Sequence, residues 1–426
     1  MLECDISMEE VIKIEGGHKL KGTVRVSGSK NTTVALIPAA VLATKGKVTI
    51  FGVPEISDVG HLSNLLQSLD VEVDQKGEDI IIDPSHMNNI ALDHSSVTKL
   101  RASYYFMGAL LGRFKKVSMK MPGGCYLGPR PIDLHLKGFE ALGATVDYSN
   151  GFYHIQAKEL VGAKIYLDTT SVGATINIMM ASVYAKGRTT IENAAKEPEI
   201  IDVATFLNKM GAQIRGAGTN IITIDGVDEL SGCVHEIIPD RIEAGTFIII
   251  AAAAAKEMVI ENIIPHHLDS LLSKLEEMGV PLQVEIDKVT VKASNHLKAV
   301  DIQTLPYPGF ATDLQQPLTP LLCVAEGNSL VKETIYIERF KHCLELQRMG
   351  ANINLSPAMA NINGPVHLSG DIVTATDLRC GASLVVAGLM AKGITEIHDI
   401  YHIDRGYDRL DEKLRACGAK IWREEV

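Results

Sequence analysis

The stretch Leu207-Asn208-Lys209-Met210-Gly211-Ala212 decides the fold, because the 426-residue chain contains six copies of its pattern. In each copy the apolar end of an amphipathic helix precedes a marker residue, and a small or β-branched residue follows it. Glycine is favoured just after a helix, where φ is positive, and aspartate reaches the same region at modest cost. The markers lie 68 to 73 residues apart and are Asp70, Gly143, Gly211, Gly279, Gly350 and Gly418.

The same elements are expected around each marker. Helices of small and apolar residues are predicted at 33–43, 174–185, 245–255 and 381–391, and they are apolar nearly all round, which indicates burial in a domain centre. A strand, an amphipathic helix and two short strands follow, so the repeat reads β-α-β-α-β-β. A repeat of this length is too long for a solenoid and is typical of a small α/β module.

The last repeat is incomplete, since eight residues follow Gly418. Residues 11–16 match the closing strand of the other copies, so we expect the N-terminal strand to complete it. The sequence thus predicts an α/β protein of two three-repeat domains, one over 30–237 and one over 1–29 plus 238–426. The chain would cross between the domains twice, and the cleft between them is the default place for a ligand.

Composition narrows the class of protein. Hydrophobic residues make up 46% and charged residues 22%, which suits a globular core. A net charge of −11 without a basic tail disfavours nucleic acid as a partner. The longest apolar run, 247–255, is too short to cross a membrane, and the acidic start does not resemble a signal peptide. Seven cysteines without a CxxC pair favour reduced thiols in the cytoplasm over disulfides or a zinc site.

Polar loops with cationic and titratable residues precede the buried helices. Helix N-termini beside a Lys or Arg bind anions, although any single loop could equally be a plain helix cap. Six such loops at one place of the repeat favour a ligand site. Neither a GxxxxGK[ST] nor a GxGxxG motif occurs, which disfavours a P-loop ATPase and a Rossmann dinucleotide binder. The loops are 27–31, 99–103, 169–173, 240–243, 311–315 and 377–379.

Two other segments could carry chemistry. Gly and Pro flank Cys125 in 122–131, which predicts a loop, and Arg130 could stabilise a thiolate there. From spacing alone, an inert buried thiol is the commoner case. The charged segment 401–409 is either an exposed turn or a place where Arg405 clamps an anion. Adjacent His266 and His267 would point in different directions, so we expect no metal site.

These stretches resemble the enolpyruvyl transferase family, and within it the UDP-N-acetylglucosamine 1-carboxyvinyltransferases. The resemblance spans the chain in order, and its most specific part is the Cys125 loop running into Arg130-Pro131-Ile132-Asp133-Leu134-His135. It implies two domains of inside-out α/β barrel type. The matching stretches are 27–31, 100–103, 122–135, 171–175, 192–202, 239–246, 312–315, 375–379 and 401–407.

The resemblance implies transfer of the enolpyruvyl group of phosphoenolpyruvate to the 3′-hydroxyl of UDP-N-acetylglucosamine by addition and elimination, with release of phosphate. This is the first committed step of peptidoglycan synthesis, on which the cell wall, cell shape and cell division depend. Cys125 would donate a proton, form a covalent adduct and be the target of fosfomycin, and Asp313 would be the base. The cationic residues Lys30, Arg130, Arg379 and Arg405 would clamp phosphoenolpyruvate. No metal or organic cofactor is implied.

The resemblance also assigns residues to the nucleotide sugar. Thr169 departs from the family, in which other members have a basic residue. No sequence feature indicates the oligomeric state. The assigned residues are Asn31, Arg101, Arg130, Pro131, Ile132, Asp133, Leu134, Thr169, Thr170, Ser171, Val172, Asp313 and Ile335.

Two alternatives remain open. A 5-enolpyruvylshikimate-3-phosphate synthase shares the architecture and the donor, but its acceptor-phosphate signature is not seen here and it has no equivalent of the Pro-Gly-Gly-Cys loop. A catalytically silent relative could bind a UDP-sugar without turning it over. The presence of Cys125, Asp313 and Lys30 together disfavours that reading.

Overall fold

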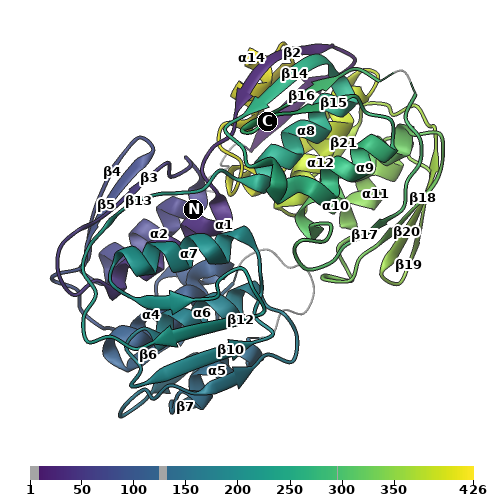
Figure 1. Cartoon of the computed structure of the whole chain (residues 1–426). Coiled ribbons are helices and arrows are strands. Elements are labelled where there is room, and N and C mark those ends of the chain that lie inside the picture. The colour runs from purple at the N-terminus through teal and green to yellow at the C-terminus, as the bar shows by residue number, and fades with distance from the viewer. Residues whose placement is uncertain (1–8, 124–131, 295) are drawn as a thin grey trace. The chain divides into compact units, whose positions relative to one another are not determined.

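The computed structural model describes residues 9–123, 132–294 and 296–426 and divides the chain into two compact units (Figure 1). Unit 1 consists of Met1–Ser27 and Pro239–Val426, and unit 2 consists of Gly28–Ile238. The chain therefore passes from one unit to the other at 27/28 and at 238/239. The predicted boundaries, 29/30 and 237/238, lie within two residues of these positions.

Unit 2 has three sheets among its described residues. In the first, β3 (Val48–Phe51) lies between β13 (Val234–Glu236) and β5 (Asp79–Asp83), with β4 (Glu72–Lys76) at the edge. The second has the order β6 (Lys116–Lys120), β8 (Phe152–Gln156), β7 (Thr145–Ser149). The third has the order β9 (Lys164–Tyr166), β10 (Arg188–Glu192), β12 (Ile221–Asp225), β11 (Gln213–Arg215).

The central helices of unit 2 are buried on nearly all sides. They are α1 (Lys30–Ala39) with η1 (Ala40–Leu42), α4 (Tyr105–Phe114) and α6 (Val172–Ser182). The other helices are α2 (Ser57–Ser68), α3 (Ser95–Lys99), η2 (Arg101–Tyr104), α5 (Asp133–Ala141) and α7 (Pro198–Lys209).

Unit 1 repeats this plan. The first of its described sheets has the order β2 (Leu20–Arg25), β14 (Ala255–Glu261), β16 (Lys288–Lys292), β15 (Leu282–Val284). The second has the order β17 (Ile302–Gln303), β18 (Gly327–Lys332), β20 (Met359–Gly364), β19 (Ile353–Ser356). The third is β21 (Ile372–Thr374), β22 (Ile394–His398), β1 (Glu10–Glu15), β23 (Lys420–Glu425). The buried helices α8 (Arg241–Ala254), α10 (Thr312–Val324) and α12 (Leu378–Met390) contact one another. The remaining helices are η3 (Pro265–Leu268), α9 (Asp269–Glu277), α11 (Lys341–Arg348), α13 (Tyr401–Asp404) and α14 (Leu410–Ala416).

All six marker residues have positive φ, from 59° at Asp70 to 113° at Gly211. Each directly follows the C-cap residue of an amphipathic helix, as Gly211 follows Met210 at the end of α7. A side chain other than Asp or Asn would be strained in this conformation. The prediction of six helix-ending markers is therefore confirmed.

The four predicted buried helices are present but begin two to four residues earlier than expected. The prediction followed the apolar run, whereas each helix begins after a polar N-cap whose side chain accepts a backbone N–H of the first turn. The caps are Ser29 for α1, Ser171 for α6, Asp240 for α8 and Asp377 for α12.

Two sheets take their first strand from a distant part of the chain. β13 pairs in parallel with β3, although more than 180 residues separate them, and β2 pairs in parallel with β14, beside which it lies in Figure 1. The N-terminal β1 lies between β22 and β23, in the place of the closing strand of the last repeat. The α/β prediction is confirmed; closure of the sheets into an inside-out barrel stays a prediction.

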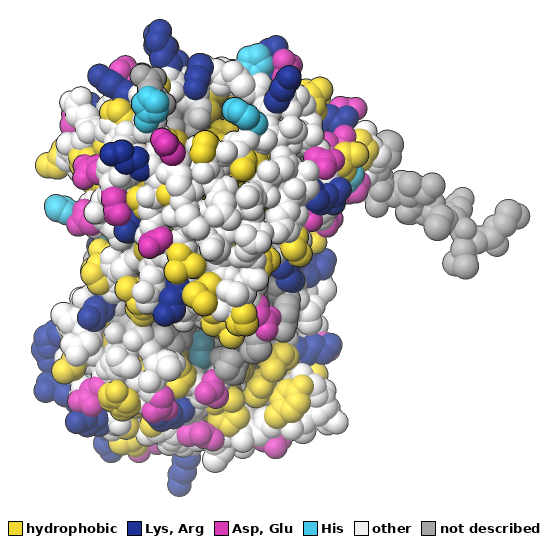
Figure 2. All heavy atoms as spheres, turned by 90° about the vertical axis from the view of Figure 1, so that its right-hand side faces the viewer, with side chains coloured by type: hydrophobic (Ala, Val, Ile, Leu, Met, Phe, Trp, Pro, Cys, Tyr) yellow, Lys and Arg dark blue, Asp and Glu magenta, His cyan; other side chains and the backbone are white. Residues whose placement is uncertain are grey.

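The surface charges and the described helices do not indicate a further class of partner. The face in Figure 2 carries Lys and Arg side chains interspersed with Asp and Glu. In the described part of the chain, no helix is long and apolar enough to cross a membrane. Nor does any cluster of three or more His, Cys, Asp or Glu side chains within the described ranges form a place for a metal ion.

Candidate active site

The Asp313 carboxylate, in the first turn of α10, is the centre of a charged cluster in unit 1. Its Oδ1 lies 2.7 Å from Arg339 Nη1, and its Oδ2 lies 3.1 Å from Arg379 Nη2. The Asp313 side chain is 23% exposed, whereas both arginine side chains are 3% exposed. Each carboxylate oxygen thus has its own buried guanidinium, and part of the Asp313 side chain remains exposed.

The two guanidiniums control the charge of Asp313. Burial alone would raise the pKa of this carboxyl, but the charges of Arg379 and Arg339, with a hydrogen bond from Arg339, outweigh burial and hold its pKa well below the usual range. Asp313 is therefore ionised at neutral pH. An ionised carboxylate is the form that accepts a proton in general base catalysis.

Arg339 is itself fixed by three neighbours on α10. Its Nε donates to Gln316 Oε1 at 3.2 Å, its Nη1 donates to Thr312 Oγ1 at 3.0 Å, and its carbonyl accepts from Gln315 Nε2 at 3.1 Å. Sequence reasoning did not single out Arg339. The search for cations followed the loops before the buried helices, and Arg339 lies in the loop before the amphipathic α11 instead.

Arg379 is held at the start of α12. Asp377 caps this helix and accepts from the Arg379 N–H at 3.0 Å, while the guanidinium lies 5.2 Å from the centre of the Tyr407 ring. The Tyr407 hydroxyl lies 2.9 Å from Thr246 Oγ1 on α8. Arg405, the C-cap residue of α13, is two residues before Tyr407. The ring of Tyr407 therefore connects Arg379 to the segment that carries Arg405.

A second group of predicted residues is brought together in unit 2 by Asn177. Its Oδ1 accepts from the Gly108 N–H at 2.8 Å, and its Nδ2 lies 2.9 Å from both the Tyr104 carbonyl and His135 Nδ1. Tyr104 and His135 pack edge to face, 4.9 Å between ring centres, and the Arg101 guanidinium lies 5.7 Å from the Tyr104 ring. Asn177, in the middle of α6, therefore links this helix to the starts of α4 and α5.

The starts of α5 and α6 carry several of the predicted sugar-binding residues. Ile132 is the N-cap residue of α5, followed by Asp133 and Leu134, and Ser171 caps α6 by accepting from the Ala174 N–H at 3.2 Å. Burial, and then the charge of Arg101, lower the pKa of His135 to about 3, so its ring is neutral. Val172 is the first residue of α6 and Thr169 lies three residues before it, whereas Asn31 lies in the first turn of α1. Thr170 Oγ1 lies 3.5 Å from Asn193 Oδ1.

Lys30 is the first residue of α1, whose cap Ser29 accepts from the Thr32 N–H at 3.2 Å. Its Nζ lies 3.3 Å from Oδ2 of Asp58, a fully buried residue of α2, and 15% of its side chain is exposed. Ile335 lies on the exposed loop after β18 in unit 1.

Cys125, Arg130 and Pro131 fall in residues 124–131, outside the described residues. The five described cysteines are free thiols. Burial raises the pKa of Cys323 and of Cys380 to about 12 and that of Cys233 to about 11, and it also raises those of Cys343 and Cys417. Among the described cysteines, none therefore has the lowered pKa of a reactive thiol.

Known proteins resemble this chain over nearly its full length. A family profile described as EPSP synthase (3-phosphoshikimate 1-carboxyvinyltransferase) matches residues 14–414. The UDP-N-acetylglucosamine 1-carboxyvinyltransferase 2 of Geobacillus kaustophilus is 58% identical over 97% of each chain. The protein of the same name from Listeria monocytogenes is also 58% identical, over 98% of this chain and 99% of its own.

Solved structures agree in fold. The enolpyruvyl transferase NikO from Streptomyces tendae matches with a TM-score of 0.89 at 27% identity, over 98% of this chain and 100% of its own. An EPSP synthase from Acinetobacter baumannii matches with a TM-score of 0.75 over the same shares at 19% identity, which is a likeness of fold alone. The chain belongs to the enolpyruvyl transferase family, within the group of the UDP-N-acetylglucosamine 1-carboxyvinyltransferases.

Proposed function

We propose that the chain transfers the enolpyruvyl group of phosphoenolpyruvate to the 3′-hydroxyl of UDP-N-acetylglucosamine and releases phosphate. The observation that carries this proposal is the ionised Asp313 between two buried guanidiniums, in a chain 58% identical to proteins named for that activity. The proposal also places the reaction in peptidoglycan synthesis and in the cytoplasm. The free thiols of the described cysteines support a reducing compartment.

In the proposed reaction Asp313 takes the proton of the sugar 3′-hydroxyl as its oxygen attacks C2 of phosphoenolpyruvate. Cys125 gives a proton to C3 in the same step, so the product is a tetrahedral ketal that still carries the phosphate. The Cys125 thiolate left by the first step then takes a proton back from C3, and the carbon–carbon double bond re-forms as the C2–O bond to phosphate breaks. The proton that Asp313 took leaves with the phosphate. Protons and electrons balance without a metal or an organic cofactor.

The clamp on Asp313 couples donor binding to base strength. Phosphoenolpyruvate is anionic, and Arg379 is one of its proposed ligands together with Lys30, Arg130 and Arg405. When the anionic donor binds to Arg379, its negative charge offsets part of the positive charge of that guanidinium. Asp313 then loses part of the attraction that lowers its pKa. The carboxylate then becomes a stronger base at the moment when the donor is bound.

The acceptor is assigned to helix starts of unit 2 and to one loop of unit 1. Free N–H groups at the start of α6, after Ser171, suit the diphosphate, and Arg101 supplies a nearby cation. Ile335 supplies exposed apolar surface. The remaining assignments, Pro131, Asp133 and Thr169 among them, are proposed from the family.

The test is release of phosphate from phosphoenolpyruvate with UDP-N-acetylglucosamine or shikimate 3-phosphate as acceptor, each with and without fosfomycin. We expect release with the UDP-sugar, blocked by fosfomycin. Release with shikimate 3-phosphate instead would assign the other enolpyruvyl acceptor. An enzyme that binds the UDP-sugar in calorimetry and releases phosphate with neither acceptor would be a silent binding protein.

A further inference from the structure

The residue that follows the second strand of the repeat has a recurring form in four of the six repeats. Gly52 after β3, Asn193 after β10, Asn262 after β14 and Asp399 after β22 all have positive φ. Both asparagines donate from Nδ2 to the carbonyl just beyond the neighbouring parallel strand, Asn193 to Leu167 at 2.8 Å and Asn262 to Val26 at 2.7 Å. In the two repeats that have asparagine here, this residue therefore turns the chain and joins the ends of two parallel strands.

The second repeat, with Met121 after β6, and the fifth repeat both depart from this form. Glu333 occupies the equivalent place after β18, and its φ is not positive. It is 1% exposed, and its Oε1 accepts from Thr304 Oγ1 at 2.7 Å, just beyond the parallel strand β17. The link between strand ends is thus retained in this repeat, but a longer and charged side chain makes it.

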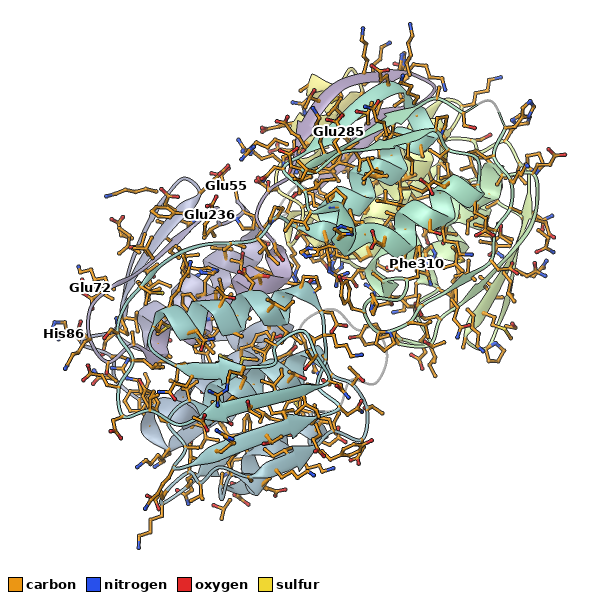
Figure 3. The ribbon with its side chains drawn as sticks, viewed as in Figure 1. Glu55, Glu72, His86, Glu236, Glu285 and Phe310 are labelled. Atoms are coloured by element: carbon orange, nitrogen blue, oxygen red, sulfur yellow. The ribbon has the colours of Figure 1, made fainter. Side chains whose placement is uncertain are left out.

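The Glu333 carboxylate makes further contacts on both of its oxygens. Its Oε1 also accepts from the N–H groups of Ile335 at 2.8 Å and Tyr336 at 3.0 Å. These two bonds turn the loop that exposes Ile335. Its Oε2 accepts from Thr312 Oγ1 at 3.0 Å. Thr312 is the first residue of α10, directly before Asp313 and two residues after Phe310, which Figure 3 labels.

The hydrogen bond between Thr312 and Glu333 fixes the orientation of the Thr312 hydroxyl. Because the hydroxyl donates its proton to Glu333, its oxygen lone pair is available to accept a hydrogen bond from Arg339 Nη1 at 3.0 Å. The same Nη1 lies 2.7 Å from Asp313 Oδ1. A continuous chain of hydrogen bonds therefore runs from Glu333 through Thr312 and Arg339 to the carboxylate of the proposed base.

We propose that Glu333 is a positioning residue for the reaction described above, and this inference rests on that proposed function. Its Oε1 sets the loop that presents Ile335 to the acceptor. Its Oε2 fixes the Thr312 hydroxyl, and through it the direction of the Arg339 guanidinium toward Asp313. Glu333 touches no reacting atom in this scheme and acts through its neighbours.

The two oxygens are separable by substitution. In Glu333→Gln the amide oxygen keeps the three bonds at the Oε1 place, while the amide nitrogen donates to Thr312 and reverses that bond. We expect kcat to fall about tenfold, the size of one hydrogen bond to a charged group, with KM for UDP-N-acetylglucosamine within about twofold of wild type. Glu333→Asn installs the residue that two other repeats use and is too short for the loop N–H groups, so we expect KM to rise about tenfold as well.

Thr312 supplies the test of the relay. Thr312→Val removes the hydroxyl and should lower kcat about as much as Glu333→Gln, and Thr312→Ser should restore it. The double variant Glu333→Gln/Thr312→Val should lose no more activity than either single variant, because both break the same chain. Ser329→Ala is the matched structural control, since Ser329 is buried on β18 and its Oγ accepts from the Val300 N–H at 3.2 Å, away from the loop.

The outcomes separate the two proposals. A wild-type enzyme that releases no phosphate with the UDP-sugar overturns the proposed function and this inference with it. An active wild type with an unchanged kcat in Glu333→Gln overturns the role of Glu333 alone. The role of Glu333 is also overturned if the kcat losses of Glu333→Gln and Thr312→Val multiply in the double variant. It is overturned as well if Ser329→Ala lowers kcat as much as Glu333→Gln does at the same loss of melting temperature. Melting curves and calorimetric binding of UDP-N-acetylglucosamine accompany each variant.

Discussion

The substitution Glu243→Gln tests the electrostatics of unit 1 close to the point where the chain leaves it. Glu243 lies in the first turn of α8 with its side chain 4% exposed. Its Oε1 is 2.5 Å from Lys413 Nζ, and its Oε2 accepts from the Ser27 N–H at 3.0 Å. The Ser27 hydroxyl donates to Asp408 at 2.7 Å, and Asp408 in turn lies 3.2 Å from Arg409 Nε.

Burial raises the pKa of Glu243 to about 7, with the charge of Lys413 opposing this and that of Asp240 adding to it. The ordinary value is 4.5, so between pH 4.5 and about 7 the folded protein holds a proton that the unfolded chain has released. The contribution of this proton to the free energy of unfolding is therefore full below pH 4.5 and is lost as pH rises to about 7. At about 1.4 kcal/mol per pH unit, the loss amounts to about 3 kcal/mol.

Glutamine has no proton to release, so Glu243→Gln removes this dependence. The assay is urea unfolding at pH 5, 6, 7 and 8, followed by fluorescence of Trp422, the single tryptophan, which lies on β23 of unit 1. We expect the free energy of unfolding of the variant, relative to wild type, to rise by about 2–3 kcal/mol from pH 5 to pH 7 and to change little above it.

A constant difference between wild type and Glu243→Gln over this pH range would refute the reasoning. Lys413→Met provides a second check with a definite sign. Loss of the ammonium removes the attraction that opposes burial, so the pH at which stability stops falling should move above 7 in that variant.

Three further predictions concern the proposed reaction. Asp313→Asn should lower kcat at least a thousandfold while calorimetry still detects UDP-N-acetylglucosamine, because an amide does not accept the hydroxyl proton; wild-type rates would assign the base elsewhere. Cys125→Ala should abolish turnover and fosfomycin labelling in mass spectrometry, whereas Cys125→Asp should escape labelling and keep some turnover if the thiol acts as an acid. Complete inactivity of the aspartate variant would indicate a covalent role. Gly173→Ala should raise KM for the UDP-sugar about tenfold and lower the melting temperature, because a Cβ there would lie 2.7 Å from the Tyr104 hydroxyl; an unchanged KM would separate this contact from acceptor binding.

The repeat was readable from sequence because its signals are local. A glycine after a helix and a run of apolar residues depend on neighbours a few positions away, and the markers therefore appear in the structure where they were predicted. Helix starts were less accurate, since the capping side chains lie outside the apolar runs that the prediction followed. The N-terminal strand could be placed because residues 11–16 have the pattern of the closing strand they replace.

Contacts between distant segments were beyond sequence reasoning. The pairing of β13 with β3 and of β2 with β14 depends on partners far along the chain, and parallel pairing leaves no local mark on either strand. Arg339 and Glu333 were missed for a related reason. Each is an ordinary charged residue in a loop, and its role depends on α10 lying beside that loop in the folded unit.

The exchange of first strands has a consequence for synthesis on the ribosome. Every partner strand of unit 2 has been made once β13 has emerged, so unit 2 is able to fold while the rest of the chain is still being translated. β2 has to wait for β14, and β1 has to wait for β22 and for β23, which ends at residue 425. β1, the first described strand of the chain, is thus among the last to find its place, because its neighbours β22 and β23 follow all the other described strands in sequence.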